Sequence, residues 1–283
     1  MPRDLEQDKP APPVPFTESP NSVTTERSES PMSSQQEEAA AAAAAASPST
    51  DRQRQFVIVP ESQQVKAPTN LHPYTRPLTI SDLDSCVALE NAAFTNPEER
   101  ATREKFRYRL TKCGELCYGI FCTVVPGSGF EIETIATGKP VESSRRNGAI
   151  SVLLGHVIST KTNDAVATDN SMGVPEDWES TSPKPSRLGH QEEGRTIVLH
   201  SVAILPGFQG RGIGRVLMMS YMQHMNGAGI ADRLSLLAHD HKTSWYEKLG
   251  FTNTGKSEAT FGGGNWLDMG FHLKTLEART AYG

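Results

Sequence analysis

The sequence contains little cysteine and no long apolar run, and each shortage excludes a class of protein. Four cysteines among 283 residues (Cys86, Cys113, Cys117 and Cys122) are too few for a disulfide scaffold, and they lack the paired spacing of a structural zinc site. No apolar stretch approaches the roughly 20 residues that a membrane-spanning helix requires. The polar amino terminus does not resemble a secretion signal. We therefore expect reduced thiols and a cytoplasmic protein, with the nucleus as an alternative location.

Excess positive charge is also absent. The chain has 28 Lys and Arg against 33 Asp and Glu, which gives a formal net charge of −5. A chain with this balance has no general attraction to the phosphates of nucleic acids or to acidic membranes. We expect neither as a partner, and we expect a monomer.

Composition divides the chain into two tails and one domain. Residues 1–70 are rich in Pro, Ser, Glu and Gln and contain eight consecutive alanines at 39–46. Such a segment buries too little apolar surface to offset the entropy of ordering, so we expect a disordered tail that could bind a regulatory partner. Residues 71–275 carry the periodic apolar patterns of a folded domain, and 276–283 form a short C-terminal tail.

Apolar periodicity in this domain predicts an α/β fold. Helix-like and strand-like segments alternate, and a polar stretch at about 160–194 is interpreted as an insertion between two strands. The order predicts a mixed central sheet with helices on both faces. The expected helices are 81–94 with Ser81 as N-cap, 97–110, 212–227 and 241–249, and the expected strands are 74–78, 116–125, 148–159, 195–205, 233–238, 250–255 and 265–273.

A glycine-rich turn at residues 209–214 (Gln-Gly-Arg-Gly-Ile-Gly) joins an expected strand to an expected helix. Such a turn leaves backbone N–H groups unpaired at the positive end of the helix dipole, where a pyrophosphate binds well. The three glycines allow close approach, and Arg211 and Arg215 could add charge. The dinucleotide-binding pattern would need a third glycine at the position of Arg215. By itself, the motif is equally compatible with an ordinary helix start.

A second glycine motif, at residues 250–257, matches the P-loop pattern G-x-x-x-x-G-K-[ST]. A P-loop needs a strand before it and a helix after it. Residues 243–249 are expected to be helical, and three consecutive glycines at 262–264 disfavour a following helix. We interpret the match as coincidence, with a helix that ends near Gly250 and leads into a strand and a glycine hairpin.

Three segments together resemble the GNAT N-acetyltransferases. The pattern Gln209-x-x-Gly212-x-Gly214 resembles their acetyl-CoA pyrophosphate loop, and residues 245–251 (Trp-Tyr-Glu-Lys-Leu-Gly-Phe) resemble the segment that follows their fifth strand. Residues 199–204 (Leu-His-Ser-Val-Ala-Ile) resemble the central strand of the arylalkylamine (serotonin) N-acetyltransferases and the fungal polyamine acetyltransferases. The resemblance covers about residues 73–274 and implies a GNAT fold with acetyl-CoA as co-substrate.

An amine acceptor requires two proton transfers. The amine has a pKa near ~10, and only its free base attacks a thioester, so a base must remove a proton. The leaving thiolate needs an acid. The resemblance implies that His200 is the base and Tyr246 the acid; a core histidine and a helix-face aromatic are the alternative interpretations. The animal serotonin enzymes carry His-x-His on this strand, but Val198 occupies the first position here, which excludes a two-histidine relay along the strand.

The resemblance also implies two sets of binding residues. The backbone of 202–204 would pair with the pantetheine arm, and the glycine turn would hold the pyrophosphate. His239 precedes Asp240 and His241 in a metal-like pattern, but no third ligand is evident, so we expect no metal. The implied cofactor-binding residues are Val202, Ala203, Ile204, Gln209, Gly210, Arg211, Gly212, Ile213, Gly214, Arg215 and Tyr246, and the implied substrate-binding residues are Phe94, Pro97, Val202, Leu237 and His239.

The sequence therefore predicts an acetyl-CoA-dependent N-acetyltransferase that acts on a small arylalkylamine or polyamine by direct attack. The alternatives are an enzyme that acetylates protein N-termini or lysines, and a GNAT-like module that binds acyl-CoA with weak turnover.

Overall fold

The computed structural model describes residues 72–141 and 147–274. The tails predicted at 1–70 and 276–283 lie outside these residues. Within the described residues, no helix is both long enough and apolar enough to cross a membrane.

The described residues form a mixed eight-stranded sheet, as predicted. Its order is β1-β2-β4-β5-β6-β8-β7, with β3 paired to β4. Only β5 and β6 run parallel, and the other neighbours are antiparallel. The strands are β1 (Tyr74–Pro77), β2 (Tyr118–Val124), β3 (Lys139–Pro140), β4 (Ile150–Thr162), β5 (Thr196–Ile204), β6 (Arg233–Ala238), β7 (Thr252–Lys256) and β8 (Leu267–His272).

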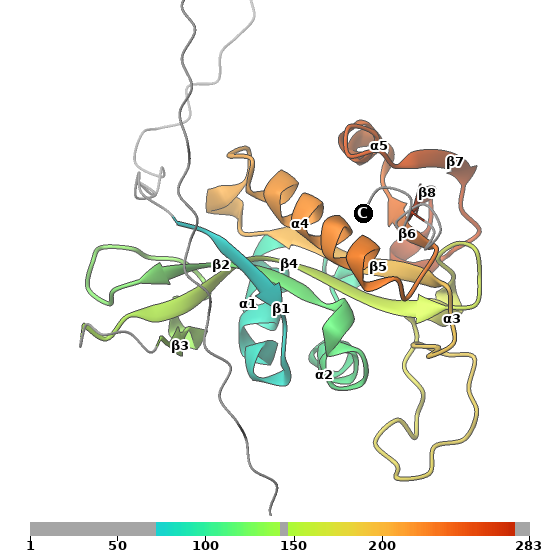
Figure 1. The fold of residues 1–283 in the computed structure, drawn as a ribbon, viewed down its shortest axis with the longest axis horizontal. Helices are drawn as coiled ribbons and strands as arrows, with labels where there is room; N and C mark the ends of the chain where they lie inside the picture. The colour runs from blue at the N-terminus through green and yellow to red at the C-terminus, as the bar shows by residue number, and fades with distance from the viewer. Residues whose placement is uncertain (1–71, 142–146, 275–283) are drawn as a thin grey trace, which may run out of the picture. The chain divides into compact units, whose positions relative to one another are not determined.

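Helices cover both faces of the sheet (Figure 1). The α-helices are α1 (Leu83–Ala93), α2 (Arg103–Lys112), α3 (Asp169–Met172), α4 (Ile213–Ala228) and α5 (Asp240–Glu247). Side chains of β4 identify the two faces, because His156 contacts Glu90 of α1 whereas Ser159 contacts Tyr221 of α4. Side chains that are an odd number of positions apart on a strand point to opposite faces of the sheet. His156 and Ser159 are three positions apart, so α1 and α4 lie on opposite faces.

The helix α4 buries a regular apolar stripe. Its buried residues recur at three- and four-residue intervals, which is the period of one helix face. The helix ends at Ala228, one residue beyond the predicted end at 227, because Gly229 adopts the left-handed conformation (φ 69°) that ends a helix. Its buried residues are Ile213, Leu217, Met218, Tyr221, Met222 and Met225.

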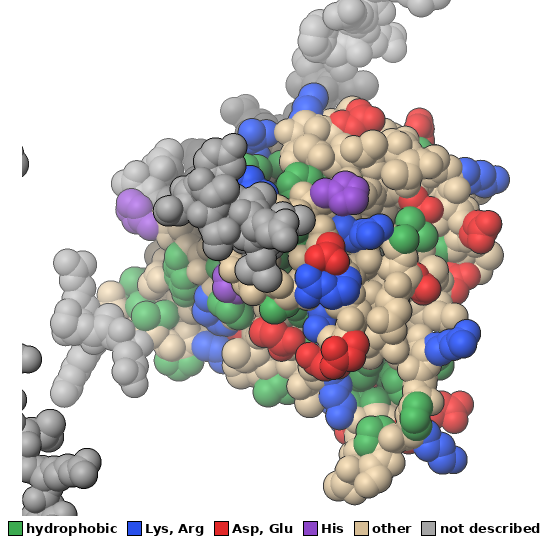
Figure 2. All heavy atoms as spheres, turned by 45° about the vertical axis from the view of Figure 1, so that its right-hand side comes forward, with side chains coloured by type: hydrophobic (Ala, Val, Ile, Leu, Met, Phe, Trp, Pro, Cys, Tyr) green, Lys and Arg blue, Asp and Glu red, His purple; other side chains and the backbone are tan. Residues whose placement is uncertain are grey.

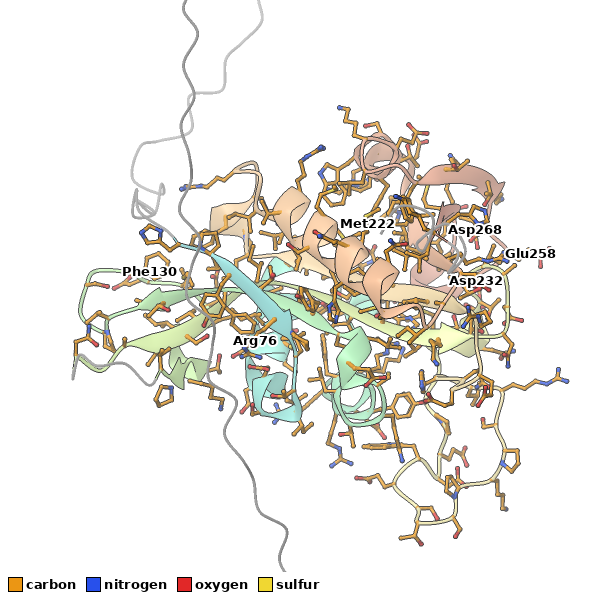
Figure 3. The ribbon with its side chains drawn as sticks, in the orientation of Figure 1. Arg76, Phe130, Met222, Asp232, Glu258 and Asp268 are labelled. Atoms are coloured by element: carbon orange, nitrogen blue, oxygen red, sulfur yellow. The ribbon has the colours of Figure 1, made fainter. Side chains whose placement is uncertain are left out.

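The first helix starts differently from the prediction. Ser81 is not its N-cap. A 3₁₀ turn, η2 (Ile80–Asp82), precedes α1, and the Asp82 carboxylate accepts the backbone N–H of Thr79 at 2.9 Å. Arg76 of β1, which is labelled in Figure 3, donates two hydrogen bonds of 2.8 Å to the same carboxylate. Asp82 therefore ties the first strand to the first helix.

The helix predicted at 97–110 is broken in two. A 3₁₀ turn, η3 (Pro97–Glu99), is separated from α2 by three non-helical residues. The Ala101 N–H donates to the side chain of Glu90, and Thr102 caps the N-terminus of α2. The helix is interrupted here because the Ala101 N–H bonds to a side chain instead of to a helical carbonyl, and because the Thr102 side chain starts a new helix.

The insertion predicted at about 160–194 lies at 163–195, because β4 continues to Thr162 and β5 starts at Thr196. It contains the short helix α3 and is fixed at several points. Trp178 is buried with an edge-on contact to Tyr108, whose hydroxyl accepts the N–H of His190 at 2.8 Å. These contacts hold the insertion against α2.

Charged side chains of both signs are interspersed on the face shown in Figure 2. Apart from the grey regions, that face shows no extended area of one sign. This distribution agrees with the small net charge of the whole chain.

We predict that Asp82→Asn lowers the free energy of unfolding by roughly 1–3 kcal/mol at pH 7, the range for hydrogen bonds to a charged group. Burial alone would raise the pKa of Asp82, but the hydrogen bonds from Arg76 and Thr79 outweigh it and leave the pKa below its ordinary value. A lowered carboxyl pKa stabilises the fold above the unfolded value of about 3.9. That stabilisation is lost as the pH falls through the folded value.

Urea denaturation from pH 7 down to pH 2.5 measures this difference. Asp84→Asn is the matched control, because Asp84 forms an exposed pair with Arg103 and should contribute less than about 1 kcal/mol. If the loss of unfolding free energy in Asp82→Asn stayed constant down to pH 2.5, the ionised Asp82 carboxylate would not be the group that stabilises the fold.

Candidate active site

The site begins with an irregularity in β5 at His200. Ile158 of β4 pairs with Ser201, and the next residue, Ser159, pairs with Leu199. His200 is therefore an extra residue in β5, a β-bulge. Its side chain contacts Thr160 of β4, and that of Ser201 contacts His156.

This bulge places two consecutive side chains on one face of the sheet. His156 and Thr160 are four residues apart on β4 and so share a face. Their partners, Ser201 and His200, must then share it too, although neighbours in a regular strand alternate. The shared face is the one that α1 covers, because Ser201 also bonds to Glu90.

An opening between β5 and β6 starts at the same point. The two strands pair only over Thr196–Leu199 and Arg233–Leu236. Both continue further, but β5 then pairs only with β4, and β6 only with β8. Residues 200–204 therefore present a backbone edge that pairs with no strand on the β6 side. The predicted pantetheine-binding residues Val202, Ala203 and Ile204 all lie on this edge.

The predicted glycine turn lies directly beyond the opening. Gly212 is the N-cap of α4 with φ 82°, and Gly210 has φ 72°; both values favour glycine. A Cβ at either position would meet no atom within 4 Å, so the space above the turn is open. Gln209 donates its side-chain N–H to the Ile204 carbonyl at 2.9 Å and so ties the turn to β5.

The start of α4 fits a phosphate group. No side chain caps it, so the first backbone N–H groups, from Ile213 onward, have no side-chain acceptor. Arg211 is exposed beside them. Free N–H groups, a helix dipole, an exposed guanidinium and open space are the features that bind a pyrophosphate.

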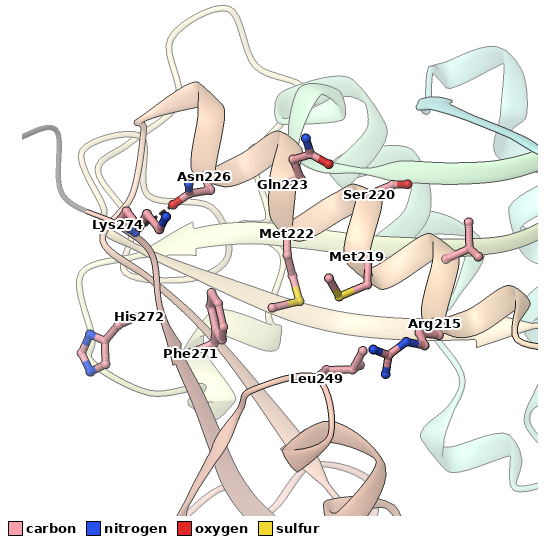
Figure 4. A pocket seen from close by; sticks show the side chains of 11 residues that line it. Arg215, Met219, Ser220, Met222, Gln223, Asn226, Leu249, Phe271, His272 and Lys274 are labelled. Carbon is pink, nitrogen blue, oxygen red and sulfur yellow. Dashed lines mark hydrogen bonds between the residues drawn. The ribbon is translucent and has the colours of Figure 1, made fainter. Parts of the chain in front are cut away.

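A groove of about 680 Å³ lies along the exposed side of α4 (Figure 4). Arg215 lines it together with Met219 of α4, Leu249 after α5 and Phe271 of β8. The Arg215 side chain therefore belongs to this groove as well as to the first turn of α4. The groove is mainly apolar where α4 faces β8.

His200 is held at both ring nitrogens. Its Nε2 lies 2.8 Å from Thr160 Oγ1, and its Nδ1 lies 3.0 Å from Met172 Sδ. Burial lowers the pKa of His200 well below its usual range, and the positive charges of Arg109, Lys105 and His190 lower it further. The imidazole is neutral at physiological pH.

Two of these cations come from α2. Arg109 is buried, its Nη2 lies 3.4 Å from the Met172 carbonyl, and its Nε has no partner among the described residues. Lys105 lies one turn earlier, with its Nζ 4.6 Å from the centre of the Phe261 ring. The wall of α2 that faces His200 is therefore positively charged.

Tyr246 lies on α5, close to the glycine turn. Its neighbour Trp245 would lie 3.4 Å from a Cβ on Gly214, which brings α5 against the start of α4. The Tyr246 ring makes edge-on contacts with Trp245 and Phe251, at centroid distances of 4.9 and 5.6 Å. Burial raises the pKa of Tyr246, so the hydroxyl is protonated at neutral pH. That hydroxyl has no hydrogen-bond partner in residues 72–141 and 147–274.

The predicted substrate residues occupy two neighbouring places. Leu237 packs with Met172, Val198 and Phe261 in a small apolar cluster next to His200. His239 stacks on Trp266 at a centroid distance of 4.1 Å. These residues form one wall on the β6 side of the opening.

The other wall comes from the segment between α1 and α2. Glu99 of η3 pairs with His239 at 3.4 Å, which places the turn that begins at Pro97 beside the end of β6. Phe94 differs, because its ring packs against the main core. The structure thus brings Pro97 and His239 to one place and leaves Phe94 in the core at the base of the segment.

Sequence analysis missed a buried polar triad. Glu90, His156 and Ser201 form three mutual contacts: Ser201 Oγ to Glu90 Oε2 at 2.7 Å, His156 Nε2 to Ser201 Oγ at 3.0 Å, and His156 Nε2 to Glu90 Oε2 at 3.1 Å. His156 interrupts an apolar run at 149–158, and that interruption is the sign of the triad that the sequence offers.

The two other motifs have structural explanations. Residues 252–256 of the P-loop match form the exposed strand β7, not a phosphate loop that leads into a helix. His239 and His241 stack at a centroid distance of 5.6 Å. Among the described residues, no three His, Cys, Asp or Glu side chains are arranged to hold a metal ion.

Residues 187–273 match the model of the Acetyltransferase (GNAT) domain family. The match spans β5, the glycine turn, α4, β6, α5, β7 and β8. It therefore includes the opening between β5 and β6, the glycine turn at 209–214 and the segment 245–251. It supports a GNAT acetyltransferase domain.

Individual proteins are similar to parts of this domain. Serotonin N-acetyltransferase from Mesocricetus auratus is 31% identical over 85 residues, which are 30% of this chain and 41% of the relative. The loading GNATL domain of CurA from Lyngbya majuscula has a TM-score of 0.47 and 12% identity, and the match covers 71% of this chain and 98% of that domain. The ribosomal-protein-S18-alanine N-acetyltransferase from Escherichia coli has a TM-score of 0.40 and 12% identity, with coverage of 72% and 95%.

We predict that His200 titrates below the ordinary histidine value of about 6.5. Lys105→Met should raise its midpoint, because the variant keeps the apolar stem and removes one of the charges that oppose protonation. NMR titration of the imidazole resonances from pH 4.5 to 8 measures both effects. An ordinary midpoint in the wild type, or one that Lys105→Met leaves unchanged, would show that burial and charge do not control this residue.

Proposed function

We propose that this protein is an acetyl-CoA-dependent N-acetyltransferase that acts on the primary amine of a small arylalkylamine. The observation that carries the proposal is the opening between β5 and β6, with an uncapped glycine turn at its end. Many proteins have a glycine-rich helix start, but here it lies next to an unpaired strand edge. An extended acyl-pantetheine arm could pair with that edge while its pyrophosphate rests on the turn.

We assign the parts of the proposed co-substrate site from the course of the backbone. Residues 202–204 would offer N–H and C=O groups to the amides of pantetheine. The turn residues Gln209, Gly210, Gly212 and Gly214 would surround the pyrophosphate, with Arg211 as a nearby cation. In this arrangement the thioester would lie between β5 and Tyr246.

Two side chains would handle protons. Tyr246 is protonated, so it can donate to the thiolate as the C–S bond breaks. His200 is neutral and can therefore accept a proton, but its low pKa makes it a weak acceptor. Both of its nitrogens are also engaged, with Thr160 and Met172.

The walls favour an aromatic amine over a polyamine. A polyamine carries several positive charges and needs carboxylates along its length. Here α2 contributes the cations Lys105 and Arg109, and the carboxylate of Glu99 is already paired with His239. Phe261 and Trp266 instead supply aromatic surface beside the apolar cluster.

The insertion favours a small acceptor over a protein. A protein N-terminus or lysine needs an open groove, whereas Met172 of α3 lies directly on His200. Asp169 of the same helix accepts the backbone N–H groups of Thr260 and Phe261 and so fixes α3 across the β7–β8 turn. This contact narrows the approach to the acceptor side.

We predict that the protein releases thiol from acetyl-CoA with tryptamine, and releases it more slowly with a polyamine or a peptide N-terminus. Tyr246→Phe keeps the ring and removes only the proton donor, so kcat should fall by about 10²–10⁴ while the affinity for acetyl-CoA stays the same. A thiol-release assay and calorimetric titration measure the two quantities.

Tyr221→Phe is the matched control for this experiment. Tyr221 is a buried tyrosine of α4 whose hydroxyl contacts Ser159 on the face opposite α1, so its loss should affect stability but not kcat. Equal turnover for Tyr246→Phe and wild type would refute the role of Tyr246. Wild-type protein that releases no thiol with any of these acceptors would refute the proposed function itself.

A further inference from the structure

We propose that Glu90, His156 and Ser201 form a proton relay that removes the proton from the acceptor amine. This inference rests on the proposed function and adds the residues that receive the proton. The starting observation is that His200 is a weak proton acceptor. Its imidazole is neutral, lies near several cations and is bonded at both nitrogens.

The triad is fully inside the protein. The exposed fraction is 0% for His156, 1% for Glu90 and 3% for Ser201. Burying an ionisable carboxyl and an imidazole is costly unless they are paired, and an apolar core would be more stable at this place. Ser201 is the member nearest to the site, since it follows His200 on the β5 edge that borders the opening.

Glu90 is the member suited to end the relay. Its Oε2 accepts the Ser201 hydroxyl, and its Oε1 accepts the Ala101 N–H at 2.9 Å. Both donors bond to the carboxyl group, and the guanidinium of Arg109 lies near enough to interact with it electrostatically. The Ala101 bond also ties Glu90 to the segment that carries Pro97, which forms the wall next to His239.

His156 holds the other two members. The network assigns its proton to Nε2, which faces both Glu90 and Ser201. Its Nδ1 has no partner among the described residues. The Nε2–H group of His156 therefore holds Glu90 and Ser201 together.

The proton transfer follows from these contacts. The acceptor ammonium gives one proton to Ser201 Oγ while the Ser201 hydroxyl proton passes to Glu90 Oε2. The products are a free amine, an intact serine and a neutral carboxylic acid. The amine then forms the C–N bond as the C–S bond breaks, and its second proton neutralises the thiolate through Tyr246. Glu90 returns its proton to solvent before the next cycle. Ser201 is the group that meets the amine, and Glu90 and His156 act through it.

A structural role alone predicts a different pH dependence. A network that only holds α1 on the sheet would, when broken, reduce activity by the same factor at every pH. A relay matters most where the amine is protonated and matters less as the pH approaches the amine pKa of about 10. The pH profile therefore separates the two roles.

The test compares kcat/KM for the best amine in four proteins from pH 6.5 to 9.5. These are the wild type, Ser201→Ala, Glu90→Gln and the double variant. We expect each single variant to lose about 10²-fold at pH 7, the lower end of the range for general acid–base catalysis, and to recover most of it by pH 9.5. Because both residues serve one proton path, kcat/KM of the double variant should be no lower than that of the less active single variant.

Ser159→Ala is the control for loss of a buried serine. Ser159 lies on the α4 face of β4 and bonds to Leu116 and Tyr221, so its removal lowers stability and leaves the pH profile unchanged. Melting temperatures of all variants, with and without acetyl-CoA, identify any that fail to fold. Glu90→Gln preserves size and the acceptor for Ala101, so it tests the relay even if another variant is unstable.

The outcomes separate the two proposals. A pH-independent loss in Ser201→Ala and Glu90→Gln, or additive losses in the double variant, would overturn the relay and leave the proposed function intact. Inactive wild-type protein with every amine would overturn both.

Discussion

A single extra residue in β5 sets the geometry of the place where we propose that the co-substrate binds. His200 shifts the register against β4, and from that point β5 no longer pairs with β6. A regular strand would have kept both ladders closed and alternated its side chains. The bulge instead opens a backbone edge that leads to the glycine turn, and it directs His200 and Ser201 to the same face. The co-substrate edge and the polar acceptor side are two consequences of one irregularity.

The acceptor side is electrostatically unusual for a core. Lys105 and Arg109 face His200 from α2, and the carboxylate of Glu90 lies in the same layer. Buried charge of this kind costs stability, and most of the buried residues in the described part of the chain are apolar. Burial and the nearby cations lower the pKa of His200, while Ser201 and Ala101 donate hydrogen bonds to Glu90. A neutral imidazole and a hydrogen-bonded carboxylate can thus coexist near one amine.

Local patterns predicted most of the fold, because periodicity and turn chemistry are local properties. The strand 233–238 has the predicted bounds, and the glycine turn was placed correctly at the start of α4. The bulge was not predicted, since one extra residue barely changes an apolar run. The triad was not predicted either, because Glu90 and Ser201 are 111 residues apart. The break before α2 was missed because it depends on a hydrogen bond from Ala101 to the Glu90 side chain, 11 residues earlier, which helical periodicity does not reveal.

Hydrogen exchange with and without acetyl-CoA tests the central claim most directly. If the bulge at His200 creates the co-substrate slot, acetyl-CoA should protect the amides of 202–204 and 210–215. Gly212→Glu, which puts a carboxylate over the turn, should abolish this protection, whereas Gly207→Glu, at a nearby open position, should retain it. Protection confined to 250–257, or protection that survives Gly212→Glu, would contradict the account.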